Sequence, residues 1–305
     1  MIKEFNSLKG ILALMIFAHH CPLEFGWKLG LGIIAVTLFF MLSGFLSAVG
    51  YRDKIQSTSF SYKQYIIGKA VKFYPLHWLF LLAAIPLSIF SVTNWGEYFA
   101  TMLLNASLLQ SLIPIKPVYF SFNAVSWFLS DTLIFVAIFP FILKGMLNAR
   151  QITKLILGVT ILLVYISAWV FIPVEHTHQF FYINPLFRLL DFVVGIQCGL
   201  WFMELKEKHK LSSLIARHTT AFHWLGFSFL IGLTYMATLD DQICFHSIIY
   251  LPIACILLIH IGLNGGVFIK SHFTENWLHI FCLLPCASNC AEIRYAGIRL
   301  TWYRR

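Results

Sequence analysis

Long apolar stretches separated by short polar loops run through almost the whole chain. Each regular stretch is close to the roughly 20 residues that cross the hydrocarbon core of a bilayer as a helix. These stretches are 8–25, 30–50, 74–92, 124–145, 155–173, 186–204, 221–239 and 247–264, with a less regular one near 276–293. The first is not a removable signal peptide, because no small-residue cleavage site follows it and a second span comes directly after. The pattern predicts an all-α fold, a polytopic transmembrane helix bundle of about 8–10 spans.

The composition supports a membrane protein. Hydrophobic residues make up 59% of the 305 residues and charged residues 11%, and the mean hydropathy is +0.78. Soluble domains carry about 25% charged residues, so a soluble enzyme is excluded, and residues 1–280 are expected to form one membrane domain. A net charge of +9 would suggest nucleic acid for a soluble protein. Here the basic residues lie mostly in short loops, so membrane lipid is the expected partner and nucleic acid is not.

The distribution of charge in the loops predicts an orientation. The loops 51–73, 144–154 and 205–218 are basic and are expected on the cytoplasmic side, whereas 174–185 and 240–246 contain acidic residues and no Lys or Arg. This assignment requires 93–123 to begin and end on the outer side. The apolar segment 96–113 is therefore predicted to be a re-entrant or interfacial helix, and the N-terminus is predicted to be cytoplasmic.

The first apolar stretch contains an unusual pair of histidines, His19 and His20. An imidazole in hydrocarbon needs a partner or a function. Lys9 lies eleven residues before His20, which is three helical turns plus roughly 20°, so both lie on one helix face about 16 Å apart. Lys9 could hold a phosphate and His20 could act as a base, while His19 points about 100° away. A snorkelling lysine followed by interfacial histidines explains the same spacing.

Two further basic residues share a helix face. Lys69 and Lys72 lie three residues apart and suit a phosphorylated ligand such as coenzyme A. Plain anchoring at the cytoplasmic surface accounts for most such lysine pairs and is the preferred explanation from these two residues alone.

Acidic and basic residues also occur near the start of two later spans. Trp127 and Asp131 are four residues apart, and an ionisable residue there is a candidate functional group, although Asp131 could simply complement the helix N-terminus. Arg188 and Asp191 are three apart and could pair, either as a structural ion pair or as a substrate contact. Gly195 and Gly199 form a GxxxG pattern that permits close helix packing.

The cysteines and the C-terminal residues give two further predictions. None of the seven cysteines forms a CxxC pair, so neither a disulfide framework nor a metal site is predicted. Cys282, Cys286 and Cys290 have helical spacing that could bind a metal, but coincidence is the more common origin of such spacing. Residues 281–305 form an atypical tail with dispersed arginines, which is expected to reflect a frameshift or truncation near residue 280.

Taken in order, these segments resemble the acyltransferase 3 family of integral-membrane O-acyltransferases. The matching blocks are Lys9 to His20, Leu38 to Leu46 (which contains Ser43), Lys69 to Pro75, Ser126 to Pro140, and Arg188 to Gly195. The chain has lysine where the family has arginine at 9, 69 and 72, and aspartate in the glutamate position at 131. The family's last helix is not found.

The resemblance implies transfer of an acyl group, most simply acetyl from acetyl-CoA, to a hydroxyl of a surface or exported glycan in a bacterial inner (plasma) membrane. Acyl-CoA is then the donor substrate and no tightly bound cofactor is expected. His20, or His19, is the expected catalytic base. Lys9, Lys69 and Lys72 are expected to bind acyl-CoA, and the supporting residues are Ser43, Trp127, Asp131, Arg188 and Asp191.

Two alternatives remain open from the residues. A polytopic transporter or flippase would use intramembrane His, Asp and Arg to line a pathway. An inactive, truncated acyltransferase relative would keep the fold alone. Charged residues that are concentrated at a few helix ends, rather than spread over many spans, favour the enzyme.

Overall fold

The computed structural model describes residues 4–20, 31–208 and 246–264, together with positions 226, 228, 232 and 235. The α-helices with described bounds are α1 (Glu4–His20), α2 (Leu31–Gln56), α3 (Tyr62–Ser88), α4 (Trp95–Ala106), α5 (Lys116–Tyr119), α6 (Trp127–Asn148), α7 (Gln151–Phe171), α8 (Pro185–Glu207) and α12 (Leu251–Asn264). Short 3₁₀ turns and a π-helix (His178–Ile183) connect some of them. The described ranges contain no strand, so the predicted all-α fold is confirmed.

Five of these helices, α2, α3, α6, α7 and α8, are long and apolar enough to cross a membrane. The apolar parts of α1 and α12 are shorter. Of the predicted span 221–239, the structure describes only the single positions named above. The predicted span 276–293 and the tail 281–305 lie outside the described residues. The other predicted spans each coincide with one of the helices above.

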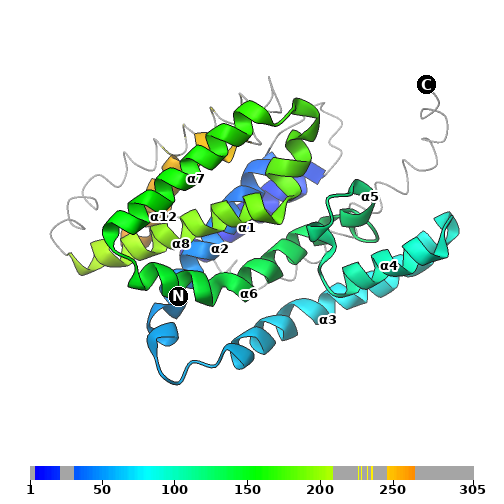
Figure 1. The fold of residues 1–305 in the computed structure, drawn as a ribbon, viewed down its shortest axis with the longest axis horizontal. Coiled ribbons are helices and arrows are strands. Elements are labelled where there is room, and N and C mark those ends of the chain that lie inside the picture. The colour runs from blue at the N-terminus through cyan, green and yellow to red at the C-terminus, as the bar shows by residue number, and fades with distance from the viewer. Residues whose placement is uncertain are drawn as a thin grey trace.

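Helices α2 and α8 cross closely at the centre of the bundle (Figure 1). A Cβ atom on Gly195 would collide with the carbonyl oxygen of Met41, and one on Gly199 would lie 2.8 Å from the carbonyl oxygen of Phe45. Gly44 of α2 makes the reciprocal approach to the Phe192 carbonyl oxygen. Small residues let helix backbones approach in this way, so the GxxxG prediction is confirmed.

The remaining helices surround this pair. α6 packs against α2 and α8 and carries α3 on its other side, while α12 packs against α8 and α1 (Figure 1). Helices α3 and α7 leave many large apolar side chains exposed, among them Leu82, Leu163 and Trp169. In a membrane these faces contact lipid, so the surface of this protein needs no polar covering there.

The loop predicted over 51–73 is wrong in its extent. Helix α2 continues to Gln56, and α3 begins at Tyr62 after Ser61, whose hydroxyl accepts a hydrogen bond from the Gln64 N–H at 3.4 Å. Lysine favours helices and Ser61 supplies the N-cap, so the charge in this region marks the polar end of a long helix and not a loop. Lys69 and Lys72 therefore lie on α3.

The segment 96–113 does not form a long helix. It contains the 12-residue helix α4, which begins after the N-cap Asn94, and then a 3₁₀ turn at Gln110–Leu112. Helix α4 returns along α3 (Figure 1). This agrees with the expectation that 96–113 is not a crossing helix, while the assignment of either end of the bundle to a side of the membrane stays a prediction.

Candidate functional site

Four lysines gather at one end of the bundle, here called the lysine end: Lys9, Lys54, Lys69 and Lys72. Lys69 Nζ lies over the ring of Tyr51, 5.3 Å from its centroid, and 5.5 Å from that of Tyr65. Lys54 Nζ lies over the same Tyr51 ring at 5.2 Å. The positive charge of Lys69 is close enough to those of Lys72 and Lys9 to be repelled by them. The structure thus brings together the three lysines predicted to bind acyl-CoA, from α1 and α3.

No acidic side chain among the described residues neutralises this cluster. The ion pairs formed by other basic residues at this end are Arg52 with Glu207 at 2.8 Å and Lys154 with Glu204 at 3.8 Å. Lys9, Lys69 and Lys72 have no ion-pair partner within the described ranges. An uncompensated group of ammonium groups beside aromatic rings attracts a multiply charged anion such as a phosphorylated ligand.

His19 and His20 end α1 at the opposite end of the bundle, here called the histidine end. The His19 ring lies against α2, where a Cβ on Gly32 would lie 2.5 Å from His19 Cγ. The two imidazoles contact edge to face with centroids 5.2 Å apart. Helix geometry aligns His20 with Lys9 and with the buried Ala13, since these residues are 11 and 7 positions before it. Of the two histidines, His20 therefore continues the face that carries Lys9.

His178, in the π-helix between α7 and α8, joins the histidine end. Its ring contacts those of Tyr182 at 5.2 Å and Phe120 at 6.0 Å. Burial, with the positive charges of Lys116 and His19 nearby, lowers the pKa of His178 to about 4, so its imidazole is neutral at pH 7. His176, two residues earlier in the same connection, is exposed, whereas His178 is half-buried.

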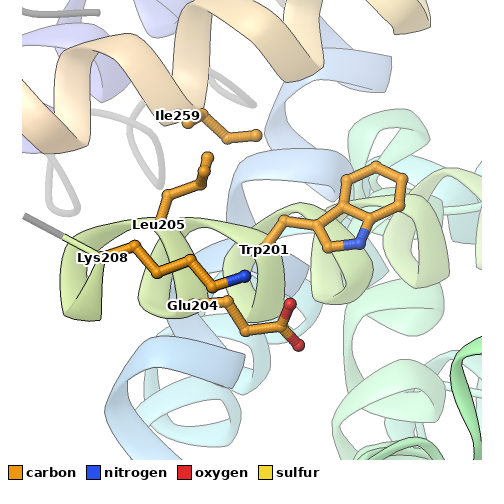
Figure 2. Close-up of a pocket in the computed structure, with 5 residues that line it drawn as sticks. All are labelled: Trp201, Glu204, Leu205, Lys208 and Ile259. Atoms are coloured by element: carbon orange, nitrogen blue, oxygen red, sulfur yellow. The ribbon is translucent and has the colours of Figure 1, made fainter. Parts of the chain in front are cut away.

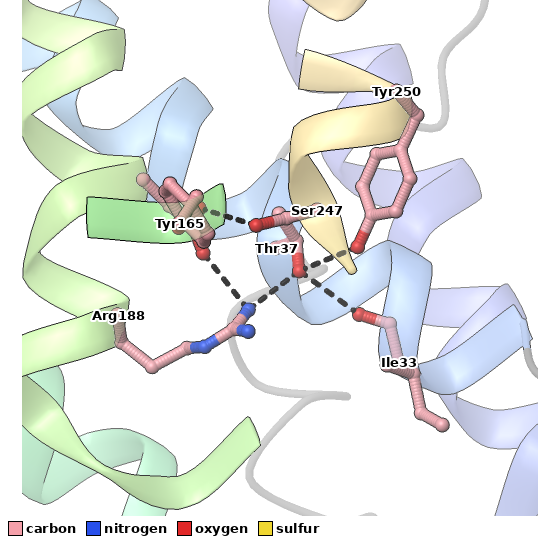
Figure 3. Close-up of polar contacts among 7 residues, drawn as sticks. Ile33, Thr37, Tyr165, Arg188, Ser247 and Tyr250 are labelled. Atoms are coloured by element: carbon pink, nitrogen blue, oxygen red, sulfur yellow. Dashed lines mark hydrogen bonds and ion pairs between the residues drawn. The ribbon is translucent and has the colours of Figure 1, made fainter. Parts of the chain in front are cut away.

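A buried network, here called the polar hub, lies between the two ends (Figure 3). Arg188 and Asp191 of α8 are both fully buried and form the predicted ion pair, with Nη1 to Oδ2 at 2.9 Å. Arg188 Nη1 also donates to Thr37 Oγ1 of α2 at 2.5 Å. The other members are Tyr165 of α7, and Ser247 and Tyr250, which precede α12.

The hydrogen bonds of the hub join α2, α7, α8 and the segment before α12. Tyr165 and Ser247 both donate to Asp191 Oδ1, the latter at 3.0 Å. Tyr250 donates to Thr37 Oγ1 at 2.9 Å, and Thr37 donates to the Ile33 carbonyl at 3.3 Å. The charge of Arg188 is therefore balanced by Asp191, but its Nε and Nη2 atoms have no hydrogen-bond partner among the described residues. Three N–H groups of a buried guanidinium remain open.

Asp131 of α6 is fully buried within electrostatic range of Arg188. Trp127, one turn earlier, is also buried and its ring lies 4.8 Å from that of Tyr182. Neither carboxylate oxygen of Asp131 accepts a hydrogen bond from the described residues. Asp131 is thus not an exposed complement to a helix N-terminus but a second buried acid near the hub.

Sequence reasoning missed most of the hub. Thr37, Tyr165, Ser247 and Tyr250 are single polar groups within apolar stretches, and nothing in their spacing marks which ones face each other. Ser43, predicted as a supporting residue, is half-buried on α2 beside Gly44. It makes no hydrogen bond or ion pair with the hub among the described residues, and its segment contributes the close helix approach at Gly44.

A separate pocket of about 190 Å³ lies between α8 and α12 near the lysine end (Figure 2). Its lining is Trp201, Glu204, Leu205, Lys208 and Ile259. Among the described residues no group of three His, Cys, Asp or Glu side chains could hold a metal ion.

The three groups lie in a fixed order along the bundle. Lys9 and His20 are about 16 Å apart along α1. On α2, Thr37 of the hub and Tyr51 of the lysine end are about 21 Å apart along the axis. The hub therefore lies closer to the histidine end, separated from the lysines by several helical turns.

Comparisons with known proteins found similarity to one family model and to a curated protein. Residues 2–286 match the family model of the acyltransferase 3 group, described as an acyltransferase domain. A curated relative, Acyltransferase MdmB of Streptomyces mycarofaciens, is 32% identical over 155 residues, which is 46% of this chain and 38% of that protein. The aligned part thus spans well under half of the relative. No solved structure matches the chain.

Proposed function

Since the chain belongs to the acyltransferase 3 family, we propose that it transfers an acyl group, most simply acetyl, from acyl-CoA to a hydroxyl of a surface or exported glycan. The observation that supports this proposal most directly is that one face of α1 carries a residue of the lysine end and a residue of the histidine end. Lys9 of α1 meets Lys69 and Lys72 of α3 at the lysine end, and His20 ends the same face at the other end.

The lysine end supplies the donor site. Coenzyme A carries several phosphate charges, and three ammonium groups without an acidic partner in the described ranges attract them. Lysines act as point charges and lack the bidentate fork of arginine, so the phosphates would be held by charge more than by directed geometry. The acyl arm would extend from there along the face of α1 towards His20.

The histidine end supplies the base. His20 removes the proton of the acceptor hydroxyl as its oxygen attacks the thioester carbonyl carbon. The C–S bond then breaks, the ester C–O bond remains, and the coenzyme A thiolate takes up the proton. A positioned general base of this kind contributes about 10²–10⁴-fold to the rate. No redox partner or metal is needed to balance the step.

A transporter fits the described residues less well. A polar pathway would place ionisable groups at successive depths. In the described ranges, Arg188, Asp191 and Asp131 gather in one buried group, and the lysines gather at one end. This clustering favours a reaction site over a transport pathway.

The proposal is tested by the O-acyl content of the glycan in cells with and without the gene. Deletion should remove one class of O-acyl ester, and the wild-type gene supplied in trans should restore it. His20→Ala should not restore it while the protein accumulates normally. An unchanged O-acyl content after deletion contradicts the proposal.

A further inference from the structure

Several buried polar atoms around Asp131 have no partner although the side chains near them are satisfied. Ser111 is the hydroxyl next to the Asp131 carboxylate, but its oxygen lies 2.7 Å from Ser130 Oγ. Ser130 Oγ also donates to the Leu108 carbonyl at 2.7 Å, so both serine hydroxyls have partners other than Asp131. Neither carboxylate oxygen of Asp131 has a hydrogen-bond partner that meets the distance and angle limits among the described residues.

The same region contains further open groups. Gln110, fully buried, donates from Nε2 to Ser126 Oγ at 3.0 Å, and its Oε1 atom accepts nothing. Arg188 presents open N–H groups at Nε and Nη2. Leaving such groups unpaired in a folded interior costs about 1–3 kcal/mol each, so the arrangement is better explained by a ligand that satisfies them.

The open groups define the chemistry of that ligand. Asp131 and Gln110 offer acceptors, and Arg188 offers donors. A hydroxyl both donates and accepts, and two neighbouring hydroxyls on a sugar ring can donate to a carboxylate while accepting from a guanidinium. We propose that Asp131, Gln110 and Arg188 form a subsite for adjacent hydroxyls of a pyranose ring; this deepens the proposed function, on which it rests, by placing the acceptor glycan.

Residues 108–122, here called the cover segment, contact the start of α6 beside Asp131 through the hydrogen bonds of Gln110 to Ser126 and of Ser111 to Ser130. Leu108 and Phe122 have positive φ angles of 55° and 56°, which are uncommon for residues other than glycine and cost energy. Hydrogen bonds hold the segment in place, including that from Gln179 Nε2 to the Pro114 carbonyl at 2.8 Å. These hydrogen bonds hold Gln110 of the subsite in place and maintain the strained backbone at both ends of the segment.

The test uses the purified full-length protein in a detergent without a sugar headgroup. The thermal midpoint Tm is measured with methyl pyranosides of gluco, galacto and manno configuration, with their deoxy analogues that lack one of the adjacent hydroxyls, and separately with acetyl-CoA. At least one pyranoside should raise the Tm of the wild-type protein and its deoxy analogue should do so less. Asp131→Asn should weaken the apparent affinity for that sugar about tenfold, because one acceptor becomes a donor facing Arg188.

Two variants control for structural effects. Asp131→Glu keeps both acceptor oxygens and should retain the sugar response, and the exposed Glu175→Gln should behave as wild type. If Asp131→Asn does not fold, Gln110→Leu replaces it with the same expected loss. The response of the wild-type protein and of these variants to acetyl-CoA should be the same.

The outcomes separate the two proposals. A response to acetyl-CoA without any response to pyranosides, or a sugar response that Asp131→Asn (or Gln110→Leu in its place) leaves unchanged, overturns the subsite and shows that the network is structural only. A sugar response lost in Asp131→Asn, in a protein that does not bind acetyl-CoA, keeps the subsite and contradicts the proposed donor.

Discussion

The two adjacent histidines at the end of α1 have different surroundings. His19 packs against Gly32 on α2, whereas His20 lies on the face that carries Lys9. A side chain used for packing and one used for proton transfer should respond differently to truncation. This difference makes the histidine pair an internal control for the assignment of the base.

We expect His20→Ala to lower acyl transfer by about 10²-fold or more, because a positioned general base is lost. His19→Ala should cost less activity and more stability, since its ring fills space beside α2. Initial rates and Tm of the two variants should be compared at equal protein levels. A rate that is higher for His20→Ala than for His19→Ala would assign the base to His19.

The neutral state of His178 has a consequence for the pH dependence of stability. Its pKa is about 4 in the folded protein, whereas an unperturbed histidine titrates near about 6.5. Between these values the unfolded chain binds a proton that the folded chain does not, so stability should fall as the pH falls from about 6.5 towards about 4. His178→Gln should reduce this loss, and His176→Gln, at an exposed position, should not. Tm measured across this range checks the prediction, and equal pH profiles for wild type and His178→Gln would contradict it.

At the scale of the elements, the crossing of α2 and α8 is the contact on which the site depends. It positions Thr37 beside Arg188 as well as forming the centre of the core. Gly44→Ala places a methyl group against the Phe192 carbonyl and forces the helices apart. We expect a loss of about 1–3 kcal/mol of stability, which a lower Tm would show.

Gly50→Ala is the matched control on the same helix. A Cβ there has no heavy atom within 4 Å, so the substitution should leave Tm unchanged or raise it, as alanine favours the helix. Equal effects of the two substitutions would show that the close approach of α2 and α8 contributes nothing specific.

The α3 lysines connect an element to the donor. Lys69→Gln together with Lys72→Gln should weaken acyl-CoA binding several-fold by removing two of the charges at the lysine end. The loss should shrink at high salt, where surface charges are screened. Lys63→Gln with Lys144→Gln, two exposed basic positions outside the cluster, is the control. Acyl-CoA binding is measured in detergent solution. If the double variant binds acyl-CoA as tightly as the wild-type protein, these lysines serve only as topology signals.

The sequence predicted different parts of this structure with different success. Hydrophobic length located the spans, and i, i+3 spacing predicted the Arg188–Asp191 pair, because both are local properties of a helix. The long polar start of α3 was taken for a loop because lysine-rich helix ends and loops look alike. Thr37, Tyr165 and Ser247 come together only through the packing of α2, α7 and the segment before α12, which no local pattern contains.

For the whole molecule, the order of the three groups implies that donor and acceptor arrive from opposite ends. In the proposed function, the charged part of acyl-CoA would meet the lysine end and the acceptor hydroxyl would meet the histidine end. The two ends are separated by most of the length of α1 and α2. A reaction across the bundle therefore requires the acyl group, and not the glycan, to travel through it.

Transfer of an isotope-labelled acetyl group decides whether this arrangement carries out acyl transfer. Purified protein is incubated with deuterated acetyl-CoA and with glycan isolated from cells that lack the gene, and ester label in the glycan is measured by mass spectrometry. The wild-type protein should label the glycan, His20→Ala should leave it unlabelled, and Lys69→Gln with Lys72→Gln should label it more slowly at low acetyl-CoA. A glycan that stays unlabelled with the wild-type protein, or that His20→Ala labels equally fast, would contradict acyl transfer by this site.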